Sequence, residues 1–205
     1  GKSHGWQITR WSWWSRWWQG PNTRPVWFWE EEVILDRAPT IRTERLTLRH
    51  HQMSDFAPLG ELFASERSVF MGGPIDRAKL WQWVGSEVGS WSLQGFGSWG
   101  IETHDGAFVG QVGINKPSHF PEIELGYLIM PEFEGKGIAF EAAKAARTWA
   151  FETLKLDTVV SYIDPKNTRS IALATRLGAS HDTLAALPDG ETSDETSVFR
   201  HRRAA

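Results

Sequence analysis

The spacing of hydrophobic positions changes type several times along the chain after residue 39. Alternation of hydrophobic and polar residues is typical of strands, and a repeat of about 3.6 residues is typical of helices. The two kinds of segment follow one another without an internal repeat or a low-complexity linker. This pattern predicts a mixed α and β fold and is typical of neither a helical bundle nor an all-β sandwich.

The alternating segments predict at least six strands. These segments are residues 41–49, 98–103, 108–114, about 122–130, 158–163, and one or two closing strands that end near Phe199. His104-Asp105-Gly106 separates the second and third of these, and an Asp-Gly pair at that place favours a hairpin. Pro131 ends the fourth, because proline has no N–H to donate to a neighbouring strand.

Four segments predict helices. They are residues 54–63 after a Ser54-Asp55 cap, a helix opened by Pro74-Ile75-Asp76, about 138–153, and about 168–177. In the second helix Trp81, Trp83 and Trp91 recur at near-helical spacing and are expected in the core. In the third, one stripe is apolar and the opposite face is polar. The stripe is Ile138, Ala142, Ala145, Ala146 and Trp149, and the polar face is Glu141, Lys144, Thr148 and Glu152.

Composition narrows the class of protein. A chain of 205 residues with 40% hydrophobic and 23% charged residues is of the size and composition of one globular domain. The net charge of -3 offers no basic surface for nucleic acid. The absence of cysteine excludes disulfides, thiolate metal sites and a cysteine nucleophile. We expect no metal and, because we find neither a membrane-spanning run nor a secretory signal, a cytoplasmic protein without a membrane partner.

Tryptophan is the abnormal residue. The chain has 13, and eight of them precede residue 30 in a segment that also carries Arg10, Arg16 and Arg24. A mixture of Trp and Arg can sit at a membrane interface, but this one has no clear polar face. We expect residues 1–37 to be a non-native or artefactual leader and residues 38–205 to be the functional domain.

The most informative stretch is Glu134-Gly135-Lys136-Gly137-Ile138-Ala139, which lies between a predicted strand and a predicted helix. Glycines at a helix start leave backbone N–H groups unpaired and unobstructed, and the helix dipole favours an anion there. Lys136 can add charge. The pattern therefore predicts a phosphate or pyrophosphate site, although Gly-x-Gly before a helix is often only a tight turn.

Other glycine patterns are less informative. Residues 95–100 match the dinucleotide fingerprint literally, but they lead into a strand, whereas the mechanism of that motif requires a helix to follow. The chain also lacks the Gly-Lys-Ser/Thr ending of a P-loop, so ATP or GTP hydrolysis is not expected. A later segment, Asn167 to Ala179, has Asn167 at a predicted helix start as a cap and Gly178 as a stop.

Residues 39–202 resemble the GNAT superfamily of N-acetyltransferases, particularly the type that acetylates ribosomal-protein N-termini (RimJ/RimL-like). Five motifs occur in the family's order. They are Ile41 to Arg49 as the opening strand, Glu124-Leu125-Gly126-Tyr127 as the central strand, Glu134 to Ala139 as the coenzyme A pyrophosphate loop, Asn167-x-x-Ser170 with Arg176-Leu177-Gly178-Ala179 as the late helix, and Val198-Phe199-Arg200-His201 as the closing strand.

The resemblance implies a mixed, mostly antiparallel central sheet with a splayed parallel strand pair and about four flanking helices. It implies transfer of an acetyl group from acetyl-CoA to an amine, with the pantetheine arm lying between the strand that contains Tyr127 to Ile129 and the strand that begins near Thr158. The acceptor is a peptide N-terminus or a small molecule, and the protein is a monomer or a homodimer. The residues expected to bind the cofactor are Leu128, Ile129, Gly135, Lys136, Gly137, Ile138, Ala139, Asn167 and Ser170.

Catalysis needs a base for the amine and an acid for the departing thiolate. Glu122 and Glu124 lie on one strand face and are the candidate bases, with Glu124 preferred, although solvated strand carboxylates are an equal alternative. Ser170 is the acid that the resemblance implies, and Tyr127 is its alternative. Each of these also has a purely structural interpretation, a local backbone bond for Ser170 and packing for Tyr127. No cysteine is available for an acyl-enzyme, so we expect direct attack in a ternary complex.

Glu134 departs from the family, which usually has Gln or Arg there. A carboxylate near a pyrophosphate has the wrong sign, and it favours an alternative class, a non-catalytic acyl-CoA-binding module. Acceptor specificity is expected from residues 70–73, Trp99 and residues 115–120, with His119 as an ordinary loop residue.

Overall fold

The structure, a computed structural model, describes residues 36–203. The predicted leader 1–37 lies outside this range except for its last two residues. Four α-helices and eight strands form the described part. Among these helices, none is both long and apolar enough to cross a membrane.

Eight strands form one sheet in the order β1-β2-β3-β4-β5-β6-β8-β7. Their bounds are β1 Ile41–Arg42, β2 Leu46–Arg49, β3 Ser98–Thr103, β4 Phe108–Asn115, β5 Glu124–Ile129, β6 Thr158–Ile163, β7 Ser180–His181 and β8 Ser197–Arg202. Every neighbouring pair is antiparallel except β5 and β6, which are parallel. The mostly antiparallel sheet with one parallel pair is the predicted fold class.

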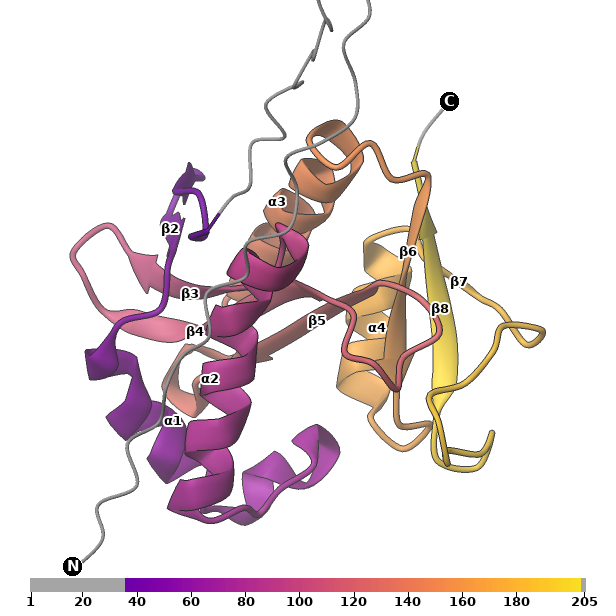
Figure 1. Cartoon of the computed structure of the whole chain (residues 1–205), viewed down its shortest axis with the longest axis horizontal. Helices are drawn as coiled ribbons and strands as arrows, with labels where there is room; N and C mark the ends of the chain where they lie inside the picture. The colour runs from indigo at the N-terminus through magenta and orange to yellow at the C-terminus, as the bar shows by residue number, and fades with distance from the viewer. Residues whose placement is uncertain (1–35, 204–205) are drawn as a thin grey trace, which may run out of the picture. The chain divides into compact units, whose positions relative to one another are not determined.

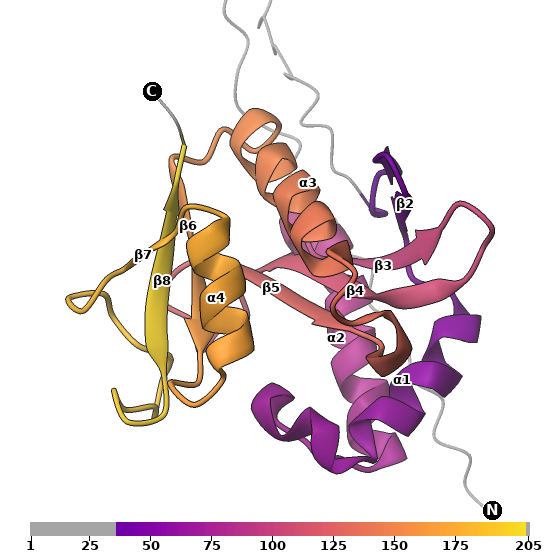
Figure 2. The same ribbon diagram turned by 180° about the vertical axis from the view of Figure 1, so that it is seen from behind.

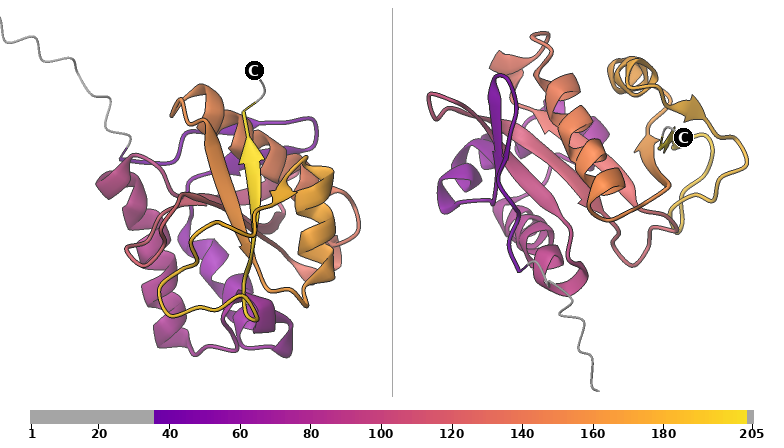
Figure 3. Two further views of the ribbon diagram at one scale, coloured as in Figure 1. Left: turned by 90° about the vertical axis from the view of Figure 1, so that its right-hand side faces the viewer. Right: turned by 90° about the horizontal axis from the view of Figure 1, so that it is seen from above.

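Helices cover both faces of the sheet. Their bounds are α1 Phe56–Phe63, α2 Arg77–Gln94, α3 Ile138–Glu152 and α4 Thr168–Arg176, with short 3-10 turns η1 Met53–Asp55, η2 Glu66–Met71 and η3 Pro131–Phe133. The two opposite views show α1 and α2 on one face and α3 and α4 on the other (Figures 1 and 2). Figure 3 shows α4 beside β6 and β8, while α3 lies across the centre of the sheet.

Two main hydrophobic clusters fill the space between the helices and the sheet. The larger contains Trp99, Ile114, Leu125 and the small residues of α3, where Ala142, Ala143 and Ala146 are fully buried. Alanine lets the helix axis approach the sheet closely. The smaller cluster joins α1 and α2 to the other face through residues such as Leu59, Leu80 and Leu128. The start of α3 is therefore held firmly beside the end of β5.

The structure corrects several sequence predictions. Residues 41–49 are two short strands, because Thr43 turns the chain and its N–H donates to the carbonyl of Leu46 at 2.9 Å. The strand predicted from about residue 122 begins at Glu124, and the closing strand continues past Phe199 to Arg202.

Two residue-level expectations also change. Of the three tryptophans of α2 expected in the core, Trp91 is fully buried and Trp83 partly buried, but Trp81 is 57% exposed. Glu141 was expected on the wet face of α3, yet its carboxylate accepts hydrogen bonds from Thr43 and Arg45. The expected apolar stripe is wider than predicted, since Ala143 and Ala150 are also fully buried.

Candidate functional site

The parallel strands β5 and β6 separate soon after they meet. Within residues 36–203 their only register pair is Glu124 with Val160, where the N–H of Val160 donates to the carbonyl of Ile123 at 2.9 Å. One step further along, the hydroxyl of Ser161 donates to the carbonyl of Leu125 at 2.7 Å. A side chain thus replaces the next backbone bond, and the predicted splay of this pair is confirmed.

Strand alternation decides which peptide groups face the opening between β5 and β6. The N–H of Met130 donates to the carbonyl of Val109 on the β4 side. Because successive peptide groups of a strand point to opposite sides, the peptide groups of Tyr127 and Ile129 face β6, and that of Leu128 faces β4. The side chain of Leu128 packs into the smaller cluster. The backbone N–H and C=O groups of Ile129 therefore face the opening, whereas those of Leu128 face β4.

The glycine loop has the backbone geometry of an anion site. Gly135 and Gly137 have φ of 73° and 77°, in the left-handed region that glycine adopts without strain. Gly137 is the N-cap of α3, and no side chain caps that helix. The first N–H groups of α3 at Ile138 and Ala139 are therefore free of a side-chain cap, and together with Lys136 they suit a phosphate.

The turn between β1 and β2 holds this loop in place. Arg45 donates from Nη1 to the carbonyl of Lys136 at 2.9 Å and from Nε to Glu141 at 2.7 Å. Glu141 also accepts from the hydroxyl of Thr43 at 2.6 Å. Residues nearly 100 positions apart thus fix the N-terminal turn of α3, and they leave the guanidinium of Arg45 beside the loop.

Glu134 is paired with two arginines. Its Oε2 lies 2.8 Å from Nη2 of Arg67 in η2 and 2.5 Å from Nη2 of Arg169 in α4. Burial opposes ionisation, but the hydrogen bonds from both guanidinium groups lower the pKa of the Glu134 carboxyl. Two cations thus surround the one carboxylate, so the local charge at the loop is positive despite Glu134.

Asn167, Ser170 and Tyr127 come together across the opening. Oδ1 of Asn167 accepts the N–H of Ser170 at 3.1 Å, which caps α4 as predicted. The hydroxyl of Tyr127 donates to the backbone carbonyl of Ser170 at 3.1 Å. Burial raises the pKa of Tyr127, so the phenol holds its proton. The two candidate acids are therefore adjacent.

The two candidate bases differ in environment. Both nitrogens of the Arg200 fork bind Glu122, at 2.7 and 2.8 Å, and these hydrogen bonds lower the pKa of Glu122. Burial raises the pKa of Glu124 to about 8, and the nearby carboxylates of Glu87 and Glu191 add to the effect. A carboxyl that titrates near neutrality suits a general base, and an arginine-paired one does not.

Glu124 and Tyr127 lie on opposite faces of β5, because they are three residues apart. Tyr127 packs on the α3 and α4 side, and Glu124 lies on the side of α1 and α2, near Glu87 of α2. We call these the donor side and the acceptor side. The donor side and the acceptor side meet at the opening where β5 and β6 separate.

The expected acceptor residues are only partly placed as predicted. A cavity of about 450 Å³ on the acceptor side is lined by Met71 and Gly72 together with residues of α1 and α2. Trp99 does not line it, because its ring is fully buried and donates to the carbonyl of Pro39 at 2.8 Å. His119 lies in a loop where its carbonyl accepts the N–H of Asp189.

Sequence reasoning missed Arg45, Arg67, Arg169 and Glu87. Arg169 lies inside the Asn167 motif and had a local signal. The other three come from a turn, a 3-10 segment and the middle of α2, where a single charged residue is unremarkable. Only their contacts bring them to the site.

Comparison with known proteins gives consistent results. Residues 45–180 match the family described as Acetyltransferase (GNAT) domain. An acetyltransferase structure from Agrobacterium tumefaciens is 43% identical, covers 81% of this chain and 95% of its own, and has a TM-score of 0.76. A putative ribosomal-protein-serine acetyltransferase from Vibrio cholerae is 27% identical, with coverages of 80% and 97% and a TM-score of 0.65.

A curated relative extends this picture over part of the chain. Spermidine N(1)-acetyltransferase of Escherichia coli is 34% identical over 77 residues, which are 37% of this chain and 41% of the relative. The family match includes the splayed strands and the glycine loop, and it reaches β7. With the family match covering more than half of the sequence and a 43% identical structure covering 81% of it, the chain belongs to the GNAT family and is an acetyltransferase.

Proposed function

We propose that this enzyme transfers the acetyl group of acetyl-CoA to a primary amine by direct attack in a ternary complex. The observation that carries the proposal is the opening between β5 and β6 with an uncapped, glycine-rich helix start beside it. The pantetheine arm lies in the opening, and the pyrophosphate lies against the N–H groups that follow Gly137. Lys136, Arg45, Arg67 and Arg169 supply positive charge around it.

The catalytic roles follow from position and proton affinity. The amine nitrogen attacks the thioester carbonyl, whose oxygen is stabilised by a backbone N–H that faces the opening, such as that of Ile129. Glu124 takes the proton that the nitrogen loses. The carbon to sulfur bond breaks, and Ser170 or Tyr127 gives the thiolate a proton. Asn167 and the backbone at Ile129, Ile138 and Ala139 position the donor.

The acceptor is an amine of a peptide N-terminus or of a small molecule. The name of the E. coli relative specifies acetylation at a nitrogen of spermidine, and the Vibrio cholerae structure is named for a ribosomal protein. The RimJ/RimL-like type stays a prediction. The pairing of Glu134 with Arg67 and Arg169 removes the reason to favour a binding module without catalysis.

The first test is a calorimetric titration with acetyl-CoA. We expect saturable binding that weakens at least tenfold in Gly137→Val, because a β-branched side chain at φ 77° displaces the loop. Gly106→Val in the hairpin turn, at φ 90°, introduces the same strain away from the loop and should leave binding unchanged. An unchanged affinity in Gly137→Val would contradict the donor site.

The second test is acetyl transfer to a panel of primary amines, followed by mass spectrometry. We expect an acetylated amine and no acetyl group on the protein. Tight acetyl-CoA binding with no product across the panel would contradict the catalytic proposal. A protein-bound acetyl group that is chased into product would contradict direct attack.

A further inference from the structure

Two glycines interrupt the side chains on the acceptor side of the sheet. Ser98, Gly113 and Gly126 lie side by side on β3, β4 and β5. The side chains of Ser98 and Asn115 lie over Gly113, and Oε2 of Glu124 lies 3.4 Å from where a Cβ of Gly126 would be. The three heavy atoms nearest to that position all belong to the Glu124 carboxyl group. Gly126 itself is partly exposed, so this carboxyl group covers it only in part.

Polar residues border these glycines in the sheet register. On the same face of the sheet, the pair that follows Gly113 and Gly126 in one direction is Asn115 with Glu124. In the other direction it is Gln111 with Leu128. Glu87 of α2 lies above Ser98, whose hydroxyl donates to it. Polar groups from a helix and three strands thus gather under α2, on the side of β5 where Glu124 lies.

Buried polar atoms without a partner among the described residues lie next to this group. Gln111 is only 5% exposed, and its Oε1 has no hydrogen-bond partner within residues 36–203. The side chain of His51 is 2% exposed, and in the same described range its Nε2 has no partner either. His51 follows β2 by two residues, and because Arg49 pairs with Gly100, the same step on β3 leads to Ser98.

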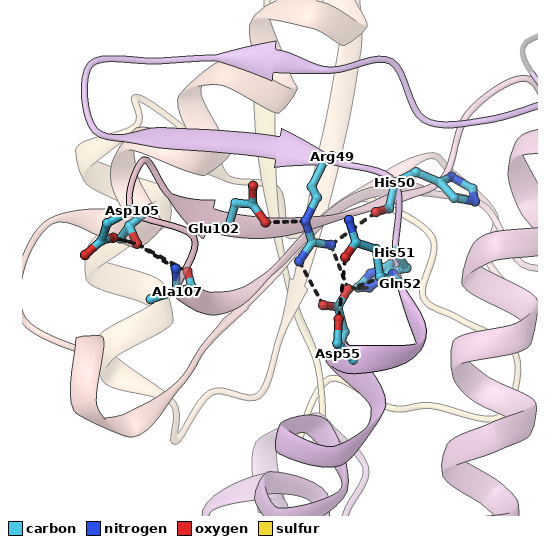
Figure 4. A network of polar contacts seen from close by, with 10 residues as sticks. Arg49, His50, His51, Gln52, Asp55, Glu102, Asp105 and Ala107 are labelled. Carbon is cyan, nitrogen blue, oxygen red and sulfur yellow. Dashed lines mark hydrogen bonds and ion pairs between the residues drawn. The ribbon is translucent and has the colours of Figure 1, made fainter.

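One nitrogen of the His51 ring is held by a carboxylate. Nδ1 of His51 lies 3.0 Å from Oδ2 of Asp55, and Arg49 binds the same carboxylate (Figure 4). Burial opposes ionisation, but the hydrogen bonds from His51 and Arg49 lower the pKa of Asp55 well below its usual range. An ionised carboxylate only accepts, so Nδ1 carries a proton, and Nε2 is the ring atom left without a partner among the described residues.

Two donors of this cluster are already used inside it. Nδ2 of Asn115 donates to the hydroxyl of Ser98 at 3.0 Å, and that hydroxyl donates to Glu87. The groups left over include the carboxyl groups of Glu87 and Glu124, the amide oxygen of Gln111 and Nε2 of His51, and each of them accepts when the carboxyl groups are ionised and the imidazole is neutral. A buried group of acceptors is complementary to a cation that donates several hydrogen bonds, as a primary ammonium does.

Among residues 36–203, neither Glu87 nor Glu124 forms a salt bridge. Burial raises the pKa of Glu87 as well as that of Glu124, and the carboxylate of Glu87 contributes to the shift at Glu124. A bound cation would favour the ionised form of both. Glu87 is attached through Ser98 to β3 and Glu124 belongs to β5, so their anchor points are two strand spacings apart, roughly 10 Å.

We propose that Glu87, Gln111 and His51 bind a second ammonium group of the acceptor while its first amine lies at Glu124. The inference rests on the proposed function and names its substrate class, short alkyl diamines and related polycations. The reactive amine reaches the opening between β5 and β6, and the alkyl chain passes over Gly126.

The test compares 1,4-diaminobutane with 1-aminobutane, which has the same chain and lacks one ammonium. We expect kcat/KM for the diamine to exceed that for the monoamine at least tenfold in the wild-type enzyme. In Glu87→Gln, which can keep the hydrogen bond from Ser98, the ratio should fall to about two, the value set by two equivalent amines. Loss of the Glu87 charge also changes the pKa of Glu124, and because this acts on both reactions, the ratio of the two kcat/KM values cancels it. Glu61→Gln removes the same charge from an exposed position on α1 and should keep the wild-type ratio.

A second variant separates binding from folding. Gln111→Leu replaces a buried, unpartnered oxygen by carbon, so we expect equal or higher thermal stability together with a lower diamine preference. Equal kcat/KM for both amines in the wild type, or a preference that survives in both variants, would overturn the inference while leaving the proposed function intact. Failure to acetylate any amine despite acetyl-CoA binding would instead contradict the proposed function.

Discussion

The donor side and the acceptor side of this enzyme are built in different ways. On the donor side, the glycine loop and the Asn167 helix start are short continuous segments, and we propose that their backbone N–H groups bind the cofactor. On the acceptor side, Glu87, Ser98, Asn115 and Glu124 come from α2, β3, β4 and β5, and none belongs to a motif except Glu124. A site made of backbone groups leaves a recognisable pattern in one short stretch of sequence, whereas a site assembled from side chains of several elements does not.

This contrast implies different sensitivities. Cofactor binding on the donor side should be sensitive to changes in backbone conformation, because it depends on N–H donors held in place by glycines with positive φ. The acceptor side should respond to isosteric changes that remove a single charge, because its groups are carboxylates. The following predictions examine the two sides in order of decreasing effect.

The largest effect is expected from Glu124→Gln. Loss of the base should lower kcat at neutral pH by about 10² to 10⁴, the usual range for general-base catalysis, and leave the acetyl-CoA affinity unchanged. Steady-state kinetics and calorimetry measure the two quantities. Equal losses in kcat and in donor affinity would show that the two sides are not separable.

The pH dependence tests the same group. With the pKa of Glu124 at about 8, the ionised base is lost as pH falls below 8. The neutral amine is lost too, so kcat/KM should fall by about a hundredfold per pH unit below both pKa values, tenfold from each group. Glu124→Gln should retain only the tenfold slope of the amine. If kcat/KM of the wild-type enzyme falls only tenfold per pH unit, Glu124 is not the base.

A smaller effect is expected from Ser170→Ala on the donor side. Because Tyr127 lies beside Ser170, either hydroxyl can protonate the thiolate, and loss of one should lower kcat by about tenfold at most. Tyr127→Phe is the matched variant. If the double variant Ser170→Ala with Tyr127→Phe loses no more than the larger of the two single changes, the two hydroxyls are not alternative proton donors.

The smallest effect is expected from Glu134→Gln. Removing the carboxylate frees Arg67 and Arg169 for the phosphates, so acetyl-CoA should bind about threefold more tightly, within the range of an exposed ion pair. Calorimetry at low and moderate salt measures this change, which should shrink as salt rises. Weaker binding would mean that Glu134 holds the arginines in their binding positions.

Much of the donor side could be predicted from the sequence. Gly135 and Gly137 before an alanine-rich stripe predicted both an anion site and close packing of α3, and the structure has that geometry. From the sequence, Glu134 places an unfavourable negative charge at this site, because no local pattern shows that Arg67 and Arg169 pair with it. Ion pairs between distant segments depend on the fold, and sequence spacing carries no information about them.

The acceptor side was predicted less well. Glu122 and Glu124 looked equivalent as neighbours on one strand face, and the difference between them comes from Arg200 of β8 and Glu87 of α2. Trp99 looked like a cleft residue, yet its position on β3 sends it into the core. A strand pattern tells which residues share a face and leaves open what covers that face.

The sequence by itself determined the order and type of most elements, the hairpin at Asp105-Gly106, the glycine loop and the family that these features resemble. Each of these depends on local preference, on periodicity or on backbone freedom, which neighbouring residues express directly. Only the tertiary structure decided the neutralisation of Glu134, the raised pKa of Glu124 and the gathering of acceptors around Glu87. Electrostatics and hydrogen bonding depend on distance in space, and the packing of elements that are far apart in the sequence sets that distance.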